Sequence, residues 1–384
     1  MGAIFTPEIV TLLVRSGAMI MVLLTTFAYL TYTERRILSF FQWRLGPNRV
    51  GPQGLFQPLA DGVKTVLKQE MVPRKADKVL YFLAPALTLS ASFTIFALVP
   101  VGERVALSSV PVAVLMFLGL SSLSAYGLIL AGWSSQSKYP FLGALRTCAQ
   151  VISYELALGL CLLVPIMITG SLNINDFGLM YQSANWNWLY LIVLIPTAIL
   201  FLISSLAETG RTPFDLPECE SEIVAGYHTE YSSMKYAMFP MGEYIAMVGM
   251  SAMVVHMLLG GYFMNFGFVD LTYWAGTWTV GPPEAWGWGG YRDALALTGH
   301  GFATTMTFIV KLFLLIFTFM WIRGTFPRLR YDQLMRFGWK WLLPATLILI
   351  FVTALFTAWL GPVNSSTAKA ATQTSMEVSL NARH

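Results

Sequence analysis

The sequence predicts an all-α, polytopic transmembrane protein with about eight membrane-spanning helices and short amphipathic helices at the membrane surface. Of its 384 residues, 56% are hydrophobic and only 11% are charged, too few charges to cover the surface of a soluble domain. Its apolar segments also have the length of roughly 20 residues that a helix needs to cross a bilayer, about twice that of a barrel strand.

Eight apolar segments predict the spans in chain order: residues 9–31, 79–101, 110–133, 147–169, 188–206, 237–264, 302–322 and 341–360. We expect the first to be a retained helix rather than a secretory signal, because it is long, contains Arg15 and precedes seven further spans. Residues 1–362 are expected to form a single transmembrane domain. The polar tail, residues 363–384, is expected to be disordered.

The distribution of positive charge predicts the orientation. Of the 24 lysine and arginine residues, 18 lie in the loops that follow the first, third, fifth and seventh spans. Positive loops stay in the cytoplasm, so these loops are expected to be cytoplasmic. The chain is then a multi-pass protein of the inner (cytoplasmic) membrane, with both termini on the non-cytoplasmic side.

The first cytoplasmic segment, residues 32–78, combines tight turns with a predicted surface helix. Apolar residues follow helical spacing from Leu55 to Leu67. Polar residues Gln57, Asp61 and Lys64 share this stretch, and together with nearby aromatic residues they are expected to line an amphiphilic cavity suited to a lipid-like headgroup. The preceding Glu34-Arg35-Arg36 is explained, taken alone, by arginines that snorkel to the interface.

Ionisable residues within membrane spans need a structural or functional explanation, because an ionised side chain at mid-bilayer costs at least about 2.5–3.5 kcal/mol. Glu155 lies in the fourth span and Glu243 in the sixth. Either could be protonated and hydrogen-bonded in a structural role, but together they favour an ion pathway. His256 is interpreted as a packed polar residue, and Lys311 needs a partner or a wet cavity.

The loop of residues 207–222 is the second concentration of acids. Its acidic residues are Glu208, Asp215, Glu218, Glu220 and Glu222. Asp215 and Glu218 have capping-box spacing, so a short helix with acids in its first turn is the structural explanation. That explanation does not cover the remaining acids. Clustered carboxyl groups titrate as a coupled group, and the loop is therefore interpreted as a proton relay.

Signs of a bound redox cofactor or metal are absent from the sequence. The three cysteines show no CxxC spacing, the four histidines form no haem-type pair, and no phosphate-binding glycine motif is present. We expect the chain to bind no metal and no redox cofactor alone.

Several long motifs occur in a fixed order. They are Glu34-Arg35-Arg36, Arg44-Leu45-Gly46-Pro47-Asn48-Arg49-Val50-Gly51, Gln57-Pro58-Leu59-Ala60-Asp61-Gly62-Val63-Lys64, Ile152-Ser153-Tyr154-Glu155, the acidic loop, and Pro327-Arg328-Leu329-Arg330-Tyr331-Asp332-Gln333-Leu334-Met335. With these motifs the chain, from about Glu8 to Leu360, resembles the H-subunit family of the NADH-quinone oxidoreductase known as complex I. It departs at Gly210, where the family usually has Asn.

The resemblance implies a membrane subunit of a proton-translocating NADH:quinone oxidoreductase in the respiratory chain. It would join the membrane arm to the quinone-module subunits of the hydrophilic arm, with quinone as substrate and with FMN and iron–sulfur clusters in partner subunits. The residues implied for the quinone chamber are Arg36, Gln57, Asp61, Lys64, Arg211 and Phe214. Those implied for the proton relay are Glu155, Glu208, Asp215, Glu218, Glu220, Glu222 and Glu243.

Two other classes remain open at this point. A membrane subunit of an energy-converting hydrogenase-type complex resembles this family but has no obligatory quinone, and the complete quinone-loop motifs argue against it. A stand-alone secondary transporter would show inverted repeats and interrupted helices in matching positions. We find neither in the sequence.

Overall fold

A computed structural model describes residues 7–102, 110–182, 186–215, 226–262 and 289–363, with side chains described from residue 12 and, in the last range, from residue 304. Within these ranges the fold is all-helical, as predicted. Eight helical stretches have the length and apolar character to cross a membrane: Leu12–Phe41, Lys78–Leu98, Ala113–Ser134, Lys138–Thr169, Trp188–Glu208, Ser233–Leu258, Thr304–Thr325 and Tyr331–Leu360.

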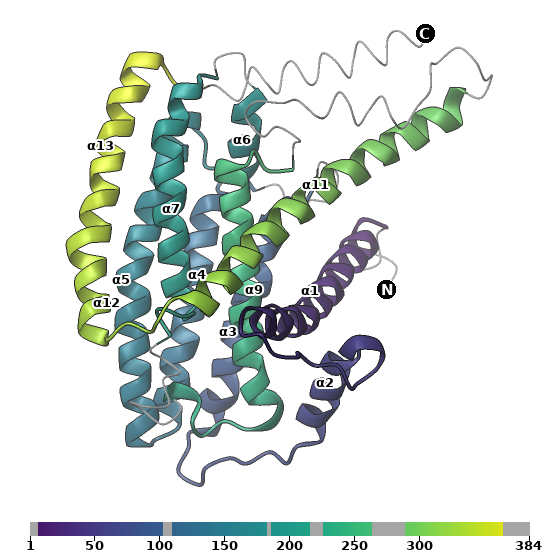
Figure 1. The fold of residues 1–384 in the computed structure, drawn as a ribbon, viewed down its shortest axis with the longest axis vertical. Coiled ribbons are helices and arrows are strands. Elements are labelled where there is room, and N and C mark those ends of the chain that lie inside the picture. The colour runs from purple at the N-terminus through teal and green to yellow at the C-terminus, as the bar shows by residue number, and fades with distance from the viewer. Residues whose placement is uncertain (1–6, 103–109, 183–185, 216–225, 263–288, 364–384) are drawn as a thin grey trace.

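Five helices form the central bundle: α3 (Lys78–Leu98), α4 (Ala113–Ser134), α5 (Lys138–Thr169), α7 (Leu191–Glu208) and α9 (Ser233–Leu258). Helix α13 (Leu343–Leu360) covers one side, whereas α1 (Pro7–Phe41) and α11 (Gly289–Thr325) slant away on the other (Figure 1). The shorter helices are α2 (Gln57–Leu67), α6 (Ile174–Leu179) and α12 (Tyr331–Phe337), with short turns η1 (Pro52–Gly54), η2 (Met180–Gln182), η3 (Trp188–Tyr190), η4 (Gly226–His228) and η5 (Gly338–Leu342).

Small residues allow the central helices to approach closely. A Cβ atom on Gly127 of α4 would lie 2.3 Å from Thr88 of α3, and one on Gly132 would lie 2.3 Å from the Ala144 methyl group of α5. Lipid gives no hydrophobic drive for helices to associate, so close van der Waals packing through small residues is what holds them together.

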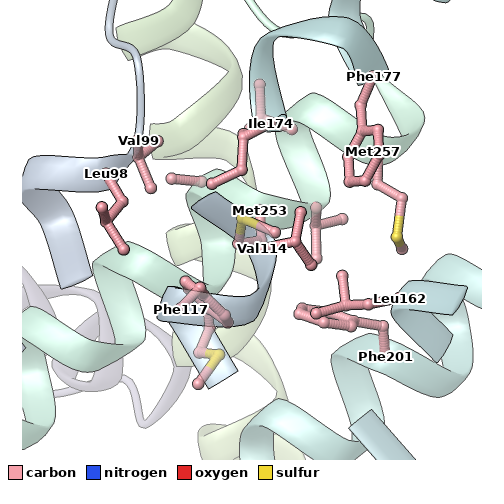
Figure 2. Packing of buried hydrophobic residues seen from close by; sticks show 14 of the residues in the cluster. Leu98, Val99, Val114, Phe117, Leu162, Ile174, Phe177, Phe201, Met253 and Met257 are labelled. Atoms are coloured by element: carbon pink, nitrogen blue, oxygen red, sulfur yellow. The ribbon is translucent and has the colours of Figure 1, made fainter. Parts of the chain in front are cut away.

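An apolar core lies among the central helices. Helices α3, α4, α5, α7 and α9 contribute to it, with buried Phe117, Phe201 and Met253 at its centre. Figure 2 shows these side chains packed together with Leu98, Val99, Val114, Leu162, Ile174, Phe177 and Met257. We call the end where α1 and α7 finish and α9 begins the basic end, because it carries most of the arginines and lysines.

The predicted spans agree with the helices, but several boundaries differ. The eighth stretch, for example, begins at Tyr331 rather than at residue 341. Helix α1 runs to Phe41, ten residues past the predicted end of the first span, so Glu34 lies within a helix. Helix α5 begins at Lys138, well before the predicted start of the fourth span. In α1 and α5, polar residues continue an apolar helix at the basic end. The predicted surface helix is present as α2, in which no residue is buried. Glu218, Glu220, Glu222 and the tail 364–384 lie outside the described residues.

Candidate functional site

A buried carboxylate forms the centre of the site at the basic end. Glu34 of α1 is 4% exposed. It pairs with Arg211, whose Nη1 lies 3.3 Å from its Oε2, and with the guanidinium of Arg323 from α11. The hydroxyl of Tyr244 on α9 donates to Glu34 Oε2 at 2.7 Å, and the Arg211 guanidinium stacks 3.8 Å above the Tyr244 ring. Glu34 thus joins three transmembrane helices to the loop after α7.

This charge cluster borders a polar cavity of about 170 Å³. Its lining residues are Gly210, Arg211, Thr212, Asp215, Tyr236, Pro240, Glu243, Tyr244 and Arg323. Asp215 is also buried, and its Oδ2 lies 3.1 Å from Arg328 Nη2. The cavity is therefore lined by two guanidinium groups and two carboxyl groups, a set that suits a polar, uncharged headgroup which gains negative charge on reaction.

The loop that carries Arg211 is held by a defined helix end. Gly210 N–H donates to Ala207 O and Arg211 N–H donates to Leu206 O, which is the Schellman pattern. Gly210 has φ +60°, in the left-handed region where Gly has no steric penalty and Asn is tolerated. Glycine therefore adopts this left-handed conformation without strain.

The buried amide of Gln150 holds the same loop in place. Gln150 Nε2 of α5 donates to Ala207 O at 2.7 Å and to Phe214 O at 2.9 Å. The Phe214 ring packs against Tyr154 and Phe337. Phe214, expected in the quinone chamber, is thus an anchor of the loop and is not among the residues that line the polar cavity.

A second, smaller cavity of about 50 Å³ lies deeper among α3, α4, α5, α7 and α9. Glu208 and Glu243 both line it, and Glu243 and Gly210 also line the polar cavity. The Tyr227 hydroxyl donates to Glu243 Oε1 at 2.8 Å. Glu243 therefore stands in the wall between the two cavities.

Glu208 continues the row of acids away from the polar cavity. Its Oε2 is buried without a hydrogen-bond partner among the described residues, and its carboxyl group interacts with the Ser121 hydroxyl and with Glu155. Glu155 accepts a hydrogen bond from Ser122 and lines a groove of about 490 Å³ on the outside of α4, α5 and α13. Asp215, Glu243, Glu208 and Glu155 thus form what we call the acid row, which runs from the polar cavity to the outer groove.

The residues predicted on and near α2 form a separate surface group. Arg35 Nη1 lies 2.7 Å from Asp61 Oδ2, and Gln57 donates to Asp61 Oδ1 at 3.1 Å. Lys64 is exposed and lies 4.0 Å from the same carboxylate, while Arg36 donates to Gln53 O at 2.7 Å. The Arg35–Asp61 pair attaches α2 to α1, and the bond from Arg36 to Gln53 attaches η1 to α1. None of the predicted residues of this group lines the polar cavity.

A latch of aromatic and charged residues ties the segment after α2 to the start of α9. Lys235 lies 2.8 Å from Glu70 and 3.3 Å above the Phe82 ring, and Tyr81 stacks on Tyr231 at 4.1 Å. Burial raises the pKa of Tyr231 to about 12, so this phenol stays neutral and hydrogen-bonded at physiological pH. The latch holds α2 next to the helix that carries Glu243 and Tyr244.

The central role of Glu34 was not predicted from the sequence, and neither were the contributions of Tyr244, Arg323 and Arg328. A signal was present: Leu23, Leu30 and Glu34 fall on one face of a helix, and all three are buried. His256 is packed as predicted, with its ring Nε2 2.9 Å from Pro100 O. Lys311 donates to the carbonyls of Leu259 and Gly261 at the end of α9.

Comparison with known proteins identifies the family. A family model described as NADH dehydrogenase matches residues 14–354. The H subunit of the NADH-quinone oxidoreductase of Rickettsia typhi is 46% identical over 327 residues, which cover 85% of this chain and 87% of that protein. The H subunit of the Rickettsia rickettsii enzyme is 44% identical over 334 residues, covering 86% and 89%. The chain therefore belongs to the NADH dehydrogenase family and is related, over most of its length, to the H subunits of NADH-quinone oxidoreductases.

Proposed function

We propose that this chain is the membrane subunit of a proton-translocating NADH:quinone oxidoreductase in which a quinone headgroup meets the start of a proton relay. The single observation that carries the proposal is the continuity of the polar cavity with the acid row through Glu243. The polar cavity offers arginines for the headgroup, and the acid row offers sites between which protons can move.

The charge change during quinone reduction provides the coupling. A quinone takes up two electrons and two protons, so negative charge develops on its oxygens before protonation is complete. Arg211 and Arg323, held in place by Glu34, would stabilise that charge. Because Glu243 lines the same cavity, the changed potential would act on it first and would be passed to Glu208 and Glu155.

Protons would pass from the relay in this chain to a neighbouring subunit at the groove beside Glu155. Since a carboxyl group that faces lipid is costly, a neighbouring membrane-arm subunit is expected to cover the groove. The hydrophilic-arm subunits would sit over the basic end and would hold the FMN and iron–sulfur clusters. In this arrangement the basic end faces the cytoplasm and both termini face the other side of the inner membrane.

The test compares Glu243→Gln with Asp332→Asn in the assembled complex. Asp332 is an exposed carboxylate in the first turn of α12, which makes it the matched control. We expect Glu243→Gln to reduce inhibitor-sensitive NADH:quinone activity and proton translocation at least about ten-fold, while Asp332→Asn leaves both unchanged. The assays use purified complex of confirmed subunit composition, reconstituted in liposomes with a pH-sensitive dye.

Two results would contradict the proposal. Full quinone reduction and an unchanged proton yield in Glu243→Gln would remove Glu243 from the pathway. Co-purification of the chain with a nickel hydrogenase, without quinone reduction from NADH, would assign it to the energy-converting hydrogenase-type complexes.

A further inference from the structure

A large apolar cavity of about 680 Å³ lies apart from the acid row. Helix α1 lines it from Arg15 to Leu30 and α11 lines it from Thr305 to Ile316, while Phe96 of α3 and Val248 of α9 close its inner side. It shares no lining residue with the polar cavity, the smaller cavity beside Glu208 or the outer groove at Glu155. The cavity follows from the slant of α1 and α11 away from the central bundle (Figure 1).

The lining is complementary to a hydrocarbon tail and carries a single cation at one end. Apart from Arg15, Thr26 and Thr305, all the side chains that line it are apolar. Arg15 lies 19 residues before Glu34 on α1, which places it near the end of the span opposite the basic end. Its exposed guanidinium offers several N–H donors in a planar fork that matches a phosphate group.

The length of the cavity fits an extended acyl chain. Arg15 to Leu30 is a rise of about 22 Å at 1.5 Å per residue, longer than half of the roughly 30 Å hydrocarbon core.

We propose that this cavity binds one phospholipid, with an acyl chain between α1 and α11 and the phosphate on Arg15. A quinone would place an uncharged headgroup beside Arg15 and would leave the cation without an anionic partner among the residues that the structure describes. A phosphodiester supplies that anion at the membrane surface, where Arg15 lies. The bound lipid would fill the gap left by the slant of α1, the helix that carries Glu34.

The experiment uses the assembled complex in nanodiscs and two photoactivatable probes with identical diazirine-bearing acyl chains, phosphatidylglycerol and diacylglycerol. We expect phosphatidylglycerol to label peptides that contain the cavity faces of both α1 and α11. Arg15→Gln should reduce this labelling roughly ten-fold, the change that corresponds to losing one charge-assisted hydrogen bond, while labelling by diacylglycerol stays the same.

Two substitutions by a bulky side chain distinguish lipid bound in the cavity from lipid in general contact with the surface. Ala18 lines the cavity, so Ala18→Phe should block labelling by both probes. Met21 is 66% exposed and does not line it, so Met21→Phe should leave labelling intact. Labelling that survives Ala18→Phe, equal labelling of Arg15→Gln and the original chain, or displacement of the probe by excess quinone would each overturn the proposal. Labelling is measured without turnover, so it does not depend on the proposed function.

Discussion

Glu34 illustrates how a single buried carboxylate can position two cations that would otherwise repel each other. It is almost fully buried, and it accepts from Arg211, Arg323 and the Tyr244 hydroxyl. Breaking a buried ion pair by removing one partner leaves an uncompensated charge, which costs more than the pair contributes. Its neighbour Arg35 pairs with Asp61 at the surface and is more than half exposed, where ion pairs contribute about 0–1 kcal/mol.

We therefore predict that Glu34→Gln destabilises the protein by about 3–5 kcal/mol and raises the KM for quinone, because Arg211 and Arg323 lose the group that orients them. Arg35→Gln should change stability by less than about 1 kcal/mol. Thermal unfolding of the purified complex and quinone kinetics check both changes. If the two variants unfold at the same temperature, Glu34 is not what compensates the two arginines.

The sequence singled out the residues of the acid row but not Glu34, which holds Arg211 and Arg323. Glu155, Glu208, Asp215 and Glu243 stood out because each is an acid in or beside an apolar span. If the helix is assumed to end near residue 31, Glu34 looks like part of a charged group at the membrane surface together with the two arginines that follow it. Only the helical continuation of α1 to Phe41 turns Glu34 inward and Arg35 and Arg36 outward.

At the scale of the element, the end of α7 decides where Arg211 lies. The Schellman bonds from Gly210 and Arg211 stop the helix one residue after Glu208 and turn the chain toward Glu34. The deeper residue, Glu208, faces the small cavity, and Arg211 faces the polar one. One helix end thus supplies a group to each of the two adjacent cavities.

We predict that Gly210→Asn preserves quinone reductase activity, whereas Gly210→Val lowers both activity and stability. The positive φ of Gly210 costs an ordinary residue about 1–2 kcal/mol, Asn less and a β-branched residue more. Activity and melting temperature of the two variants provide the measurement. Equal behaviour of Asn and Val at this position would mean that the backbone conformation there is not required.

The helix boundaries were harder to predict than the helices. Apolar length identified all eight spans, because a lipid-exposed segment has few alternatives to a helix. It could not locate the end of α1 or the start of α5, since their polar turns extend past the apolar part and make contacts with distant segments, such as Glu34 with Arg211 and Arg146 with Tyr331.

At the scale of the whole molecule, the predicted orientation can be tested independently of function. Lys68 follows α2 at the basic end, and Trp188 is exposed at the start of the span that contains α7. A cysteine at position 68 should react with a membrane-impermeant maleimide only from the cytoplasmic side, and one at position 188 only from the other side. Labelling in right-side-out and inverted vesicles decides this, and the opposite pattern would reverse the proposed topology.

The acid row also has an electrical consequence. Ser134 at the end of α4 contacts Tyr231 just before α9, so these two helix ends lie at one level. Glu243 lies ten residues into α9, and Ser122, which donates to Glu155, lies twelve residues before Ser134. At 1.5 Å per residue the two carboxyl groups have similar depths, so a proton passed between them moves mainly sideways within the bundle. A full crossing at 100 mV involves about 2.3 kcal/mol per charge, but sideways movement crosses only a small part of that field. Proton occupancy of the row should therefore respond weakly to membrane voltage, and the steps that work against the voltage would belong to neighbouring subunits.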